Sequence, residues 1–171
     1  MEQYHTLVVA ATRAAAAAAL AASALIAAPA NATPASGFSG AIEWQGPFGE
    51  VDVKAKTSDF ELKLHTKGDM NLVVTRITIA ANTGTSGWHT HPGMSLVTVT
   101  AGEIMLYEAD LCTGRRIVAG QTFVDEGGGH LHLVRNETGT VAEVGAVQLM
   151  ERGVPARVDA PRPNNCDPTV Q

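Results

Sequence analysis

The chain has 171 residues, a formal net charge of −5 and a hydrophobic fraction of 45%, which fits one soluble domain rather than two. It carries 12 lysines and arginines against 17 aspartates and glutamates, with no basic stripe. That balance argues against nucleic acid as a partner.

Residues 1–32 have the pattern of a signal peptide. Arg13 precedes an uncharged, alanine-rich run of 15 residues, and Ala30-Asn31-Ala32 supplies small residues at alternate positions, as a signal peptidase requires. The run is too short to cross a bilayer core of about 30 Å, so no stable membrane anchor is expected. A buried alanine-rich helix or an uncleaved anchor are the alternatives. We expect export, with a secreted, periplasmic or extracellular location.

Strand signals dominate the rest of the chain, after a Pro/Ser/Gly linker at 33–40. Alternating or β-branched runs recur between Gly, Asn, Asp and Pro clusters, at 49–56, 60–65, 71–79, 95–100, 104–107, 116–118, 122–124, 130–135 and 140–149. Many short strands at regular spacing predict an all-β sandwich or barrel over residues 41–155. No segment of helical period is long enough to connect parallel strands, so an α/β fold is not expected.

Two pairs of histidines stand out among the six in the chain. His89 and His91 are two residues apart, as are His130 and His132. Side chains two apart in a strand point to the same face, so each pair shares a face if its segment is extended. Pro92 follows the first pair at once and places it at a strand end.

Two cysteines, Cys112 and Cys166, lie beyond the predicted signal peptide. Cys112 falls in a probable turn and Cys166 in a polar, proline-rich tail at 156–171. In an exported protein an even count favours a disulfide, which would tie down this tail. Two free or intermolecular thiols are the alternative.

The spacing of the histidines and glycines resembles the two sequence motifs of the cupin superfamily, in particular its small, single-domain, exported bacterial members. The first motif is matched by Gly84, His89, His91 and Gly102, with Ser95 at the glutamate position. The second is matched by Gly120, Gly129, His132 and Asn136, with Gly127 at the proline position. Gly84 is one residue closer to His89 than the motif requires. The resemblance covers roughly residues 73–147.

The resemblance implies a double-stranded β-helix, or jelly-roll barrel, with one divalent transition metal near its mouth. Carried over by position, His89, His91 and His132 are the metal ligands. Imidazole suits several first-row metals, so zinc, iron, manganese, nickel and copper all remain open. The family's glutamate ligand is absent, because Ser95 occupies its place. A serine hydroxyl is a poor direct ligand, so Ser95 is expected to hold a metal-bound water or a substrate.

Two classes of function follow from the resemblance. One is a metal-dependent enzyme, a dioxygenase, isomerase or lyase that acts on a small molecule. The other is a non-catalytic barrel that binds a metal or a small ligand outside the cell. His130 and Ser95 are the candidate catalytic residues, and Glu126 is expected to be a solvated turn residue. Cupins often dimerise through edge strands, so a homodimer is one expected assembly.

Overall fold

A computed structural model describes residues 32–166. The predicted signal peptide lies outside this range except for Ala32, and it stays a prediction. The described part is built of strands, and none of its segments is a helix that could cross a membrane. The strands are β1 (Phe38–Phe48), β2 (Asp52–Lys56), β3 (Glu61–His65), β4 (Met70–Ile79), β5 (His89–Thr90), β6 (Met94–Ala101), β7 (Glu103–Glu108), β8 (Arg115–Val118), β9 (Thr122–Asp125), β10 (His132–Arg135), β11 (Ala142–Glu151) and β12 (Val158–Asp159).

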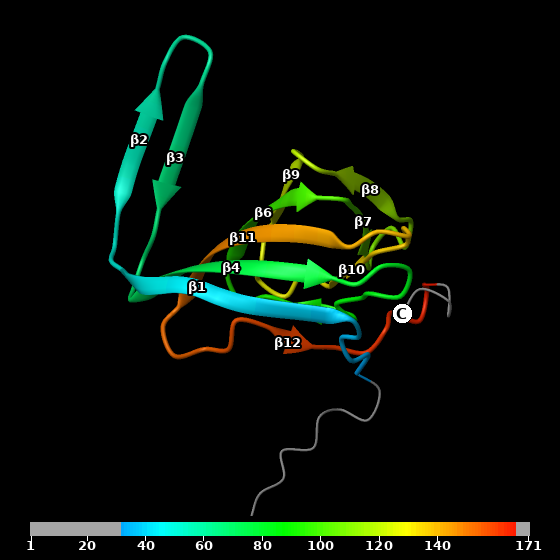
Figure 1. Ribbon diagram of the computed structural model, residues 1–171. Coiled ribbons are helices and arrows are strands. Elements are labelled where there is room, and N and C mark those ends of the chain that lie inside the picture. The colour runs from blue at the N-terminus through cyan, green and yellow to red at the C-terminus, as the bar shows by residue number, and fades with distance from the viewer. Residues whose placement is uncertain (1–31, 167–171) are drawn as a thin grey trace, which may run out of the picture.

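Two five-stranded antiparallel sheets form the barrel. One has the order β1-β4-β11-β6-β9 and the other the order β12-β5-β10-β7-β8. Consecutive strands from β4 to β7, and again from β8 to β11, belong alternately to the two sheets. The sheets therefore face each other around a common interior (Figure 1). This is a jelly-roll barrel, and the all-β prediction is confirmed.

The core lies between the two sheets because the long strands alternate. Along β11, Ala142, Val144, Ala146, Gln148 and Met150 are buried, whereas the residues between them are exposed or half-buried. Such a period of two is what a strand with one covered face requires. The main apolar cluster consists of Ile79, Val99, Ile104, Leu106, Ile117, Phe123, Val134, Ala142 and Val144.

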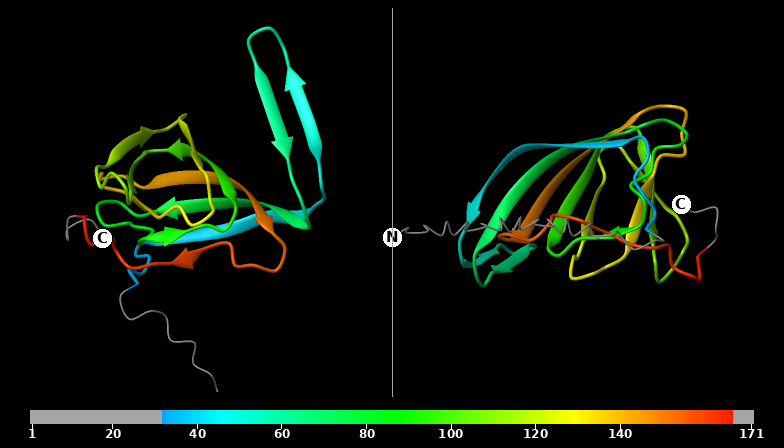
Figure 2. Two further views of the ribbon diagram at one scale, coloured as in Figure 1. Left: turned by 180° about the vertical axis from the view of Figure 1, so that it is seen from behind. Right: turned by 90° about the horizontal axis from the view of Figure 1, so that it is seen from below.

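The strands β2 and β3 form a hairpin outside the barrel wall. The sequence predicts instead that residues 49–65 contribute to that wall. These strands pair only with each other, in a separate two-stranded sheet. They stand away from the barrel in both views from the side (Figures 1 and 2). Every residue of the two strands is exposed except Leu64, which is half-buried. The alternating pattern is therefore that of a strand pair with no core to cover.

The expected boundaries of the barrel also shift at both ends. β1 begins at Phe38, inside the segment expected to be a linker, and runs beside β4 from Phe38 opposite Ile79 to Phe48 opposite Met70. β12 lies in the predicted tail and pairs with β5. Both ends of the described chain thus contribute strands to the sheets.

The tail is tied to the barrel by a disulfide between Cys112 and Cys166, as the sequence favours. Cys166 is buried and packs in a second apolar cluster with Trp88, Tyr107 and Leu133. Trp88, which immediately precedes His89, is fully buried there. The tail therefore packs against the residue that precedes β5, the strand that carries His89.

Candidate metal centre

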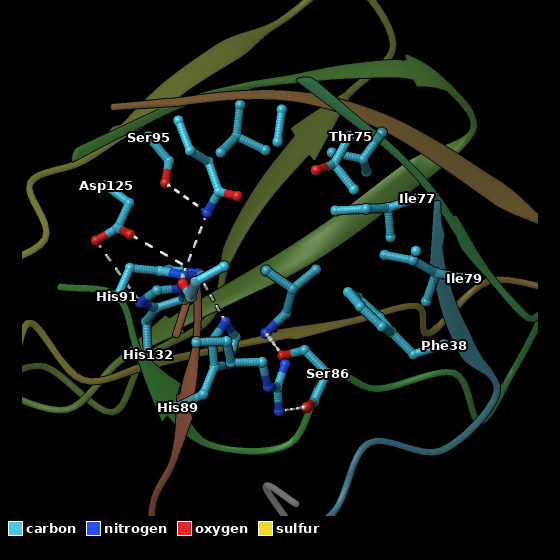
Figure 3. A pocket seen from close by; sticks show the side chains of 18 of the residues that line it. Phe38, Thr75, Ile77, Ile79, Ser86, His89, His91, Ser95, Asp125 and His132 are labelled. Atoms are coloured by element: carbon cyan, nitrogen blue, oxygen red, sulfur yellow. Dashed lines mark hydrogen bonds and ion pairs between the residues drawn. The ribbon is translucent and has the colours of Figure 1, made fainter. Parts of the chain in front are cut away.

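The backbone of the second sheet brings the two histidine motifs together. His89 in β5 lies directly opposite His132 in β10, with their ring centroids 4.4 Å apart. His91 follows β5, and its ring centroid is 4.8 Å from that of His89 and 5.4 Å from that of His132. The three rings gather at one end of the barrel interior (Figure 3). One ring nitrogen from each lies within 4.8 Å of the others, so the three residues can hold one ion.

Backbone carbonyls fix which ring nitrogen of each histidine is free. The Nδ1–H of His89 donates to the carbonyl of Gly87 at 2.9 Å, and that of His91 donates to the carbonyl of Ala156 at 2.6 Å. In a neutral imidazole the Nε2 atom then carries a bare lone pair. The two Nε2 atoms face each other at 3.1 Å. Two lone pairs at this distance repel unless a cation lies between them.

Burial keeps two of these imidazoles neutral. Desolvation, followed by the charge of His132, lowers the pKa of His89 from 6.5 to about 2. Desolvation also lowers the pKa of His132 from 6.5 to about 4, although the nearby carboxylate of Asp125 works in the opposite direction. Neutral imidazoles are the form that binds metals.

Ser95 lies on the opposite sheet and is held by a neighbour rather than by a histidine. It is almost fully buried, and its hydroxyl accepts a hydrogen bond from the side-chain amide of Gln148 at 3.2 Å. The same amide nitrogen is 3.3 Å from Nδ1 of His91. Gln148 thus links the serine to the histidine cluster.

Asp125 is a residue of the centre that the sequence analysis missed. It lies beside Ser95 in the adjacent strand β9, and its side chain is 3% exposed. Its Oδ2 is 3.9 Å from Nε2 of His91, and its Oδ1 is 3.9 Å from Nδ1 of His132. A signal existed in the alternation of β9, where the buried residues are Phe123 and Asp125.

The two other residues weighed near the site lie apart from the cavity. His130 stacks against His132 with ring centroids 5.8 Å apart, and its side chain is 33% exposed. Its Nδ1 is 3.6 Å from Oδ1 of Asp125. Glu126 is exposed, in agreement with its expected place in a turn. His130 is thus a neighbour of Asp125 and not part of the cavity wall.

The glycine run before the second motif packs on the turn that follows His91. The amides of Gly128 and Gly129 face the carbonyls of Pro92 and His91 at 3.3 and 3.5 Å. Gly127 has a φ of +71°, and a Cβ there would lie 2.3 Å from the carbonyl oxygen of Gly93. Only glycine fits this close approach of two backbones. The glycine run of the second motif is therefore in direct contact with the turn of the first motif.

A cavity of about 220 Å³ opens beside the histidine cluster. Figure 3 shows the histidines, Ser95 and Asp125 at one end and Phe38, Ile77 and Ile79 at the other. The polar lining consists chiefly of His89, His91, Ser95, Asp125, His132, Gln148 and Arg157. Most of the remaining wall is aliphatic or aromatic. The cavity therefore suits a small molecule with an apolar body and a polar group turned toward the histidines.

Comparison with known proteins gives similarities at the level of the fold. The sequence matches no protein-family model and no curated protein. The chain is similar to the polyketide cyclase RemF from Streptomyces resistomycificus, with 18% identity and a TM-score of 0.45 over 52% of this chain and 60% of that one. It is also similar to an oxalate oxidase, with 26% identity and a TM-score of 0.43 over 51% of this chain and 45% of that one.

A third similar structure is a Cupin 2 conserved barrel domain protein from Salinispora arenicola, with 22% identity and a TM-score of 0.40 over 45% of this chain and 61% of that one. The match thus spans less than two thirds of each of these three chains. In the present chain, both motifs lie in one jelly-roll barrel, and their histidines meet where two neighbouring strands of one sheet pair. This barrel is the jelly roll that the resemblance of the two motifs implies. The three imidazoles fit a metal ion, because their free nitrogens converge and their Nδ1 atoms are held by backbone carbonyls.

Proposed function

We propose that the protein is an exported cupin that binds one divalent transition metal through His89, His91 and His132. The observation that carries the proposal is the pair of Nε2 atoms, each left without a proton by the carbonyl bond of the opposite nitrogen, that face each other at 3.1 Å. Three nitrogen ligands leave open positions on the ion.

We further propose that the cavity binds a small, largely apolar molecule whose polar group lies next to the metal. A bound divalent ion would act there as a Lewis acid toward an oxygen of the molecule, as an isomerase or lyase of this kind requires, and a dioxygenase would need a redox-active ion in the same place. The chain's own residues orient the molecule and exclude water. Phe38, Ile77 and Ile79 supply the apolar wall. Gln148 presents a buried amide beside Ser95 and His91 at the polar end.

A non-catalytic metal- or ligand-binding barrel is the second candidate. Among the described residues that line the cavity, Asp125 is the one carboxylate, and the histidines are the three proposed metal ligands. If Asp125 is engaged elsewhere, no free general base faces a bound molecule. The two candidates differ in whether a bound molecule is converted into a product. To measure this, the molecule is incubated with metal-loaded protein, recovered and analysed by mass spectrometry.

The binding proposal is tested by thermal unfolding of metal-loaded protein with two classes of molecule that join an apolar body to one polar group, small phenols and aromatic carboxylates. We expect at least one of these classes to raise the unfolding temperature, and to do so only when metal is present. Ala146→Phe is the matched variant, since Ala146 is buried and lines the cavity. It should keep the metal and lose the effect. No shift with any class, or equal shifts in the Phe variant, would contradict a binding role for the cavity.

Export is proposed from the sequence pattern of residues 1–32 and is supported by the disulfide, because disulfides persist in oxidising compartments. N-terminal sequencing of the protein recovered from the periplasm or medium of an expressing bacterium tests it. The mature chain should begin at Thr33. Recovery only from the cytoplasm with Met1 retained would contradict export.

A further inference from the structure

The structure offers a carboxylate where the motif glutamate is missing. Three strands of the first sheet place Gln148, Ser95 and Asp125 side by side, since Ser95 in β6 is opposite both Gln148 in β11 and Asp125 in β9. All three side chains line the cavity. A carboxylate therefore lies one strand over from the position that the serine occupies, on the same face of the same sheet.

Asp125 is an unusual residue to bury here. Its Oδ1 accepts one hydrogen bond, from the amide of Gly127 at 3.1 Å, but its buried Oδ2 has no hydrogen-bond partner among the described residues. Burial of a carboxylate oxygen without a donor or a cation costs several kcal/mol. Oδ2 faces the cavity end at which Nε2 of His91 lies, 3.9 Å away.

His91 cannot supply the missing donor in its neutral form. Its single N–H is on Nδ1 and donates to Ala156, so its Nε2 presents a lone pair to Oδ2. Two acceptors thus face each other across 3.9 Å, in addition to the two imidazole acceptors at 3.1 Å. One cation in contact with all of these atoms satisfies them together.

We propose that Asp125 is the fourth metal ligand of this cupin and binds through Oδ2, which makes the centre a three-histidine, one-aspartate site. The inference rests on the proposed metal site at His89, His91 and His132. Atoms that share an ion at about 2.1 Å lie roughly 3–3.5 Å from each other. The separation of Oδ2 from His91 exceeds this by less than an ångström, which a side-chain rotation covers.

Charge supports the assignment. Three neutral imidazoles leave the full double charge of the ion in a largely apolar cavity, whereas one carboxylate halves it. The same contact would give Oδ2 of Asp125 the partner that it lacks in the absence of a metal. The centre thus keeps the overall charge of a histidine and glutamate site, although the acidic residue is on a different strand.

The test compares metal affinity in the full chain, measured by competition with a chelator for Zn(II) and Co(II). Asp125→Asn keeps an oxygen for the amide of Gly127 and removes the charge, and we expect its affinity to fall 10- to 1,000-fold. Its Co(II) form should also show a changed visible absorption spectrum, which reports the ligand set. Glu126→Gln is the matched control, since it removes the same charge from the adjacent, exposed residue. It should bind like wild type.

The two proposals fail in different ways. If wild type binds tightly, His89→Ala abolishes binding and Asp125→Asn matches wild type in affinity and spectrum, the fourth ligand is wrong and the three-histidine site stands. If wild type binds no metal, or His89→Ala binds like wild type, both proposals fall.

A crystal structure of zinc-loaded wild type gives the answer without any variant, even if Asp125→Asn does not fold. We expect Oδ2 of Asp125 within about 2.2 Å of the ion, together with the three histidines. An ion more than 3 Å from Asp125 overturns the assignment. So does an ion held by Asp125, His130 and His132 away from His89, which is the other cluster of close ligand atoms among the described residues.

Discussion

His89 lies directly opposite His132 in the antiparallel pair of β5 and β10. The two belong to different motifs, and only this register places their rings with centroids 4.4 Å apart. A shift of the pairing by one residue would turn one of the two side chains to the outside of the barrel. The candidate metal centre thus depends on sheet register as much as on the identity of its ligands.

The metal-free protein should lose stability as the pH falls below neutrality. The unfolded chain binds protons at both histidines below about pH 6.5, whereas the folded pKa values are about 2 for His89 and about 4 for His132. Folded stability is therefore complete above pH 6.5. Between pH 6.5 and 4 the free energy of unfolding should fall by up to about 1.4 kcal/mol per pH unit for each histidine.

Urea unfolding of chelator-treated protein at pH 7.5, 6.5 and 5.5 measures this slope. The double variant His89→Asn/His132→Asn should lose most of it, while His65→Ala, which changes an exposed histidine, should keep it. A free energy of unfolding that stays constant from pH 7.5 to 5.5 in the wild type would contradict the burial of two neutral imidazoles.

Asn136 should be a structural residue, although it belongs to the second motif. It is fully buried, and its amide donates to the carbonyls of Ile79 at 3.1 Å and Thr140 at 2.8 Å. Its Oδ1 accepts from the amide and hydroxyl of Thr138. Asn136→Ala leaves these groups without a partner and should cost about 3 kcal/mol in urea unfolding. Asn164→Ala, in an exposed turn, is the control, and equal stability of the two variants would refute this role.

The disulfide should stabilise the barrel through its tail. It closes a loop between residues 54 apart in sequence, for which the chain-entropy model gives about 4 kcal/mol as an upper value. Cys112→Ala/Cys166→Ala should therefore unfold at a clearly lower temperature in calorimetry, and reductant should lower the unfolding temperature of the wild type but not of the variant. If neither the variant nor the reductant changes that temperature, the tail is held by its other contacts alone.

The hairpin of β2 and β3 should be dispensable for the barrel and for metal binding. Phe48 and Met70 are paired neighbours at its base, so removal of residues 50–68 leaves Gly49 and Asp69 as a two-residue turn between them. A glycine in the first position suits such a turn. We expect the shortened protein to keep its metal affinity within about threefold and its unfolding temperature within a few degrees. Loss of metal binding would show that the hairpin supports the site.

The sequence predicts most strands because each is marked by local alternation. It predicts the histidine trio through the resemblance of its two motifs to those of the cupin superfamily. β1 was not predicted as a strand, since Gly40, Gly46 and Pro47 interrupt its pattern. The separate position of the hairpin was also missed. Alternation at Val53 and Leu62 has the same period as in a barrel strand, and only the tertiary structure shows that both faces are exposed.

Asp125 illustrates the limit for the site. Its role depends on cross-strand neighbours, because Ser95 is 30 positions away in sequence and yet directly opposite in the sheet. A motif written as spacings along one chain records the missing glutamate but not a carboxylate supplied by the next strand. His130 shows the converse, since its spacing from His132 suggests a shared site, while the structure stacks it beside His132 at the edge of the centre.

The central claim is that one chain holds one divalent metal through the histidine trio, and elemental analysis tests it most directly. Purified protein, stripped with a chelator, reloaded with Zn(II), Fe(II), Mn(II), Ni(II) or Cu(II) and desalted, should retain close to one equivalent of at least one of these metals per chain. The variant His89→Ala/His91→Ala, treated in the same way, should retain none. Wild type that retains no metal, or a variant that retains as much as wild type, would contradict the account.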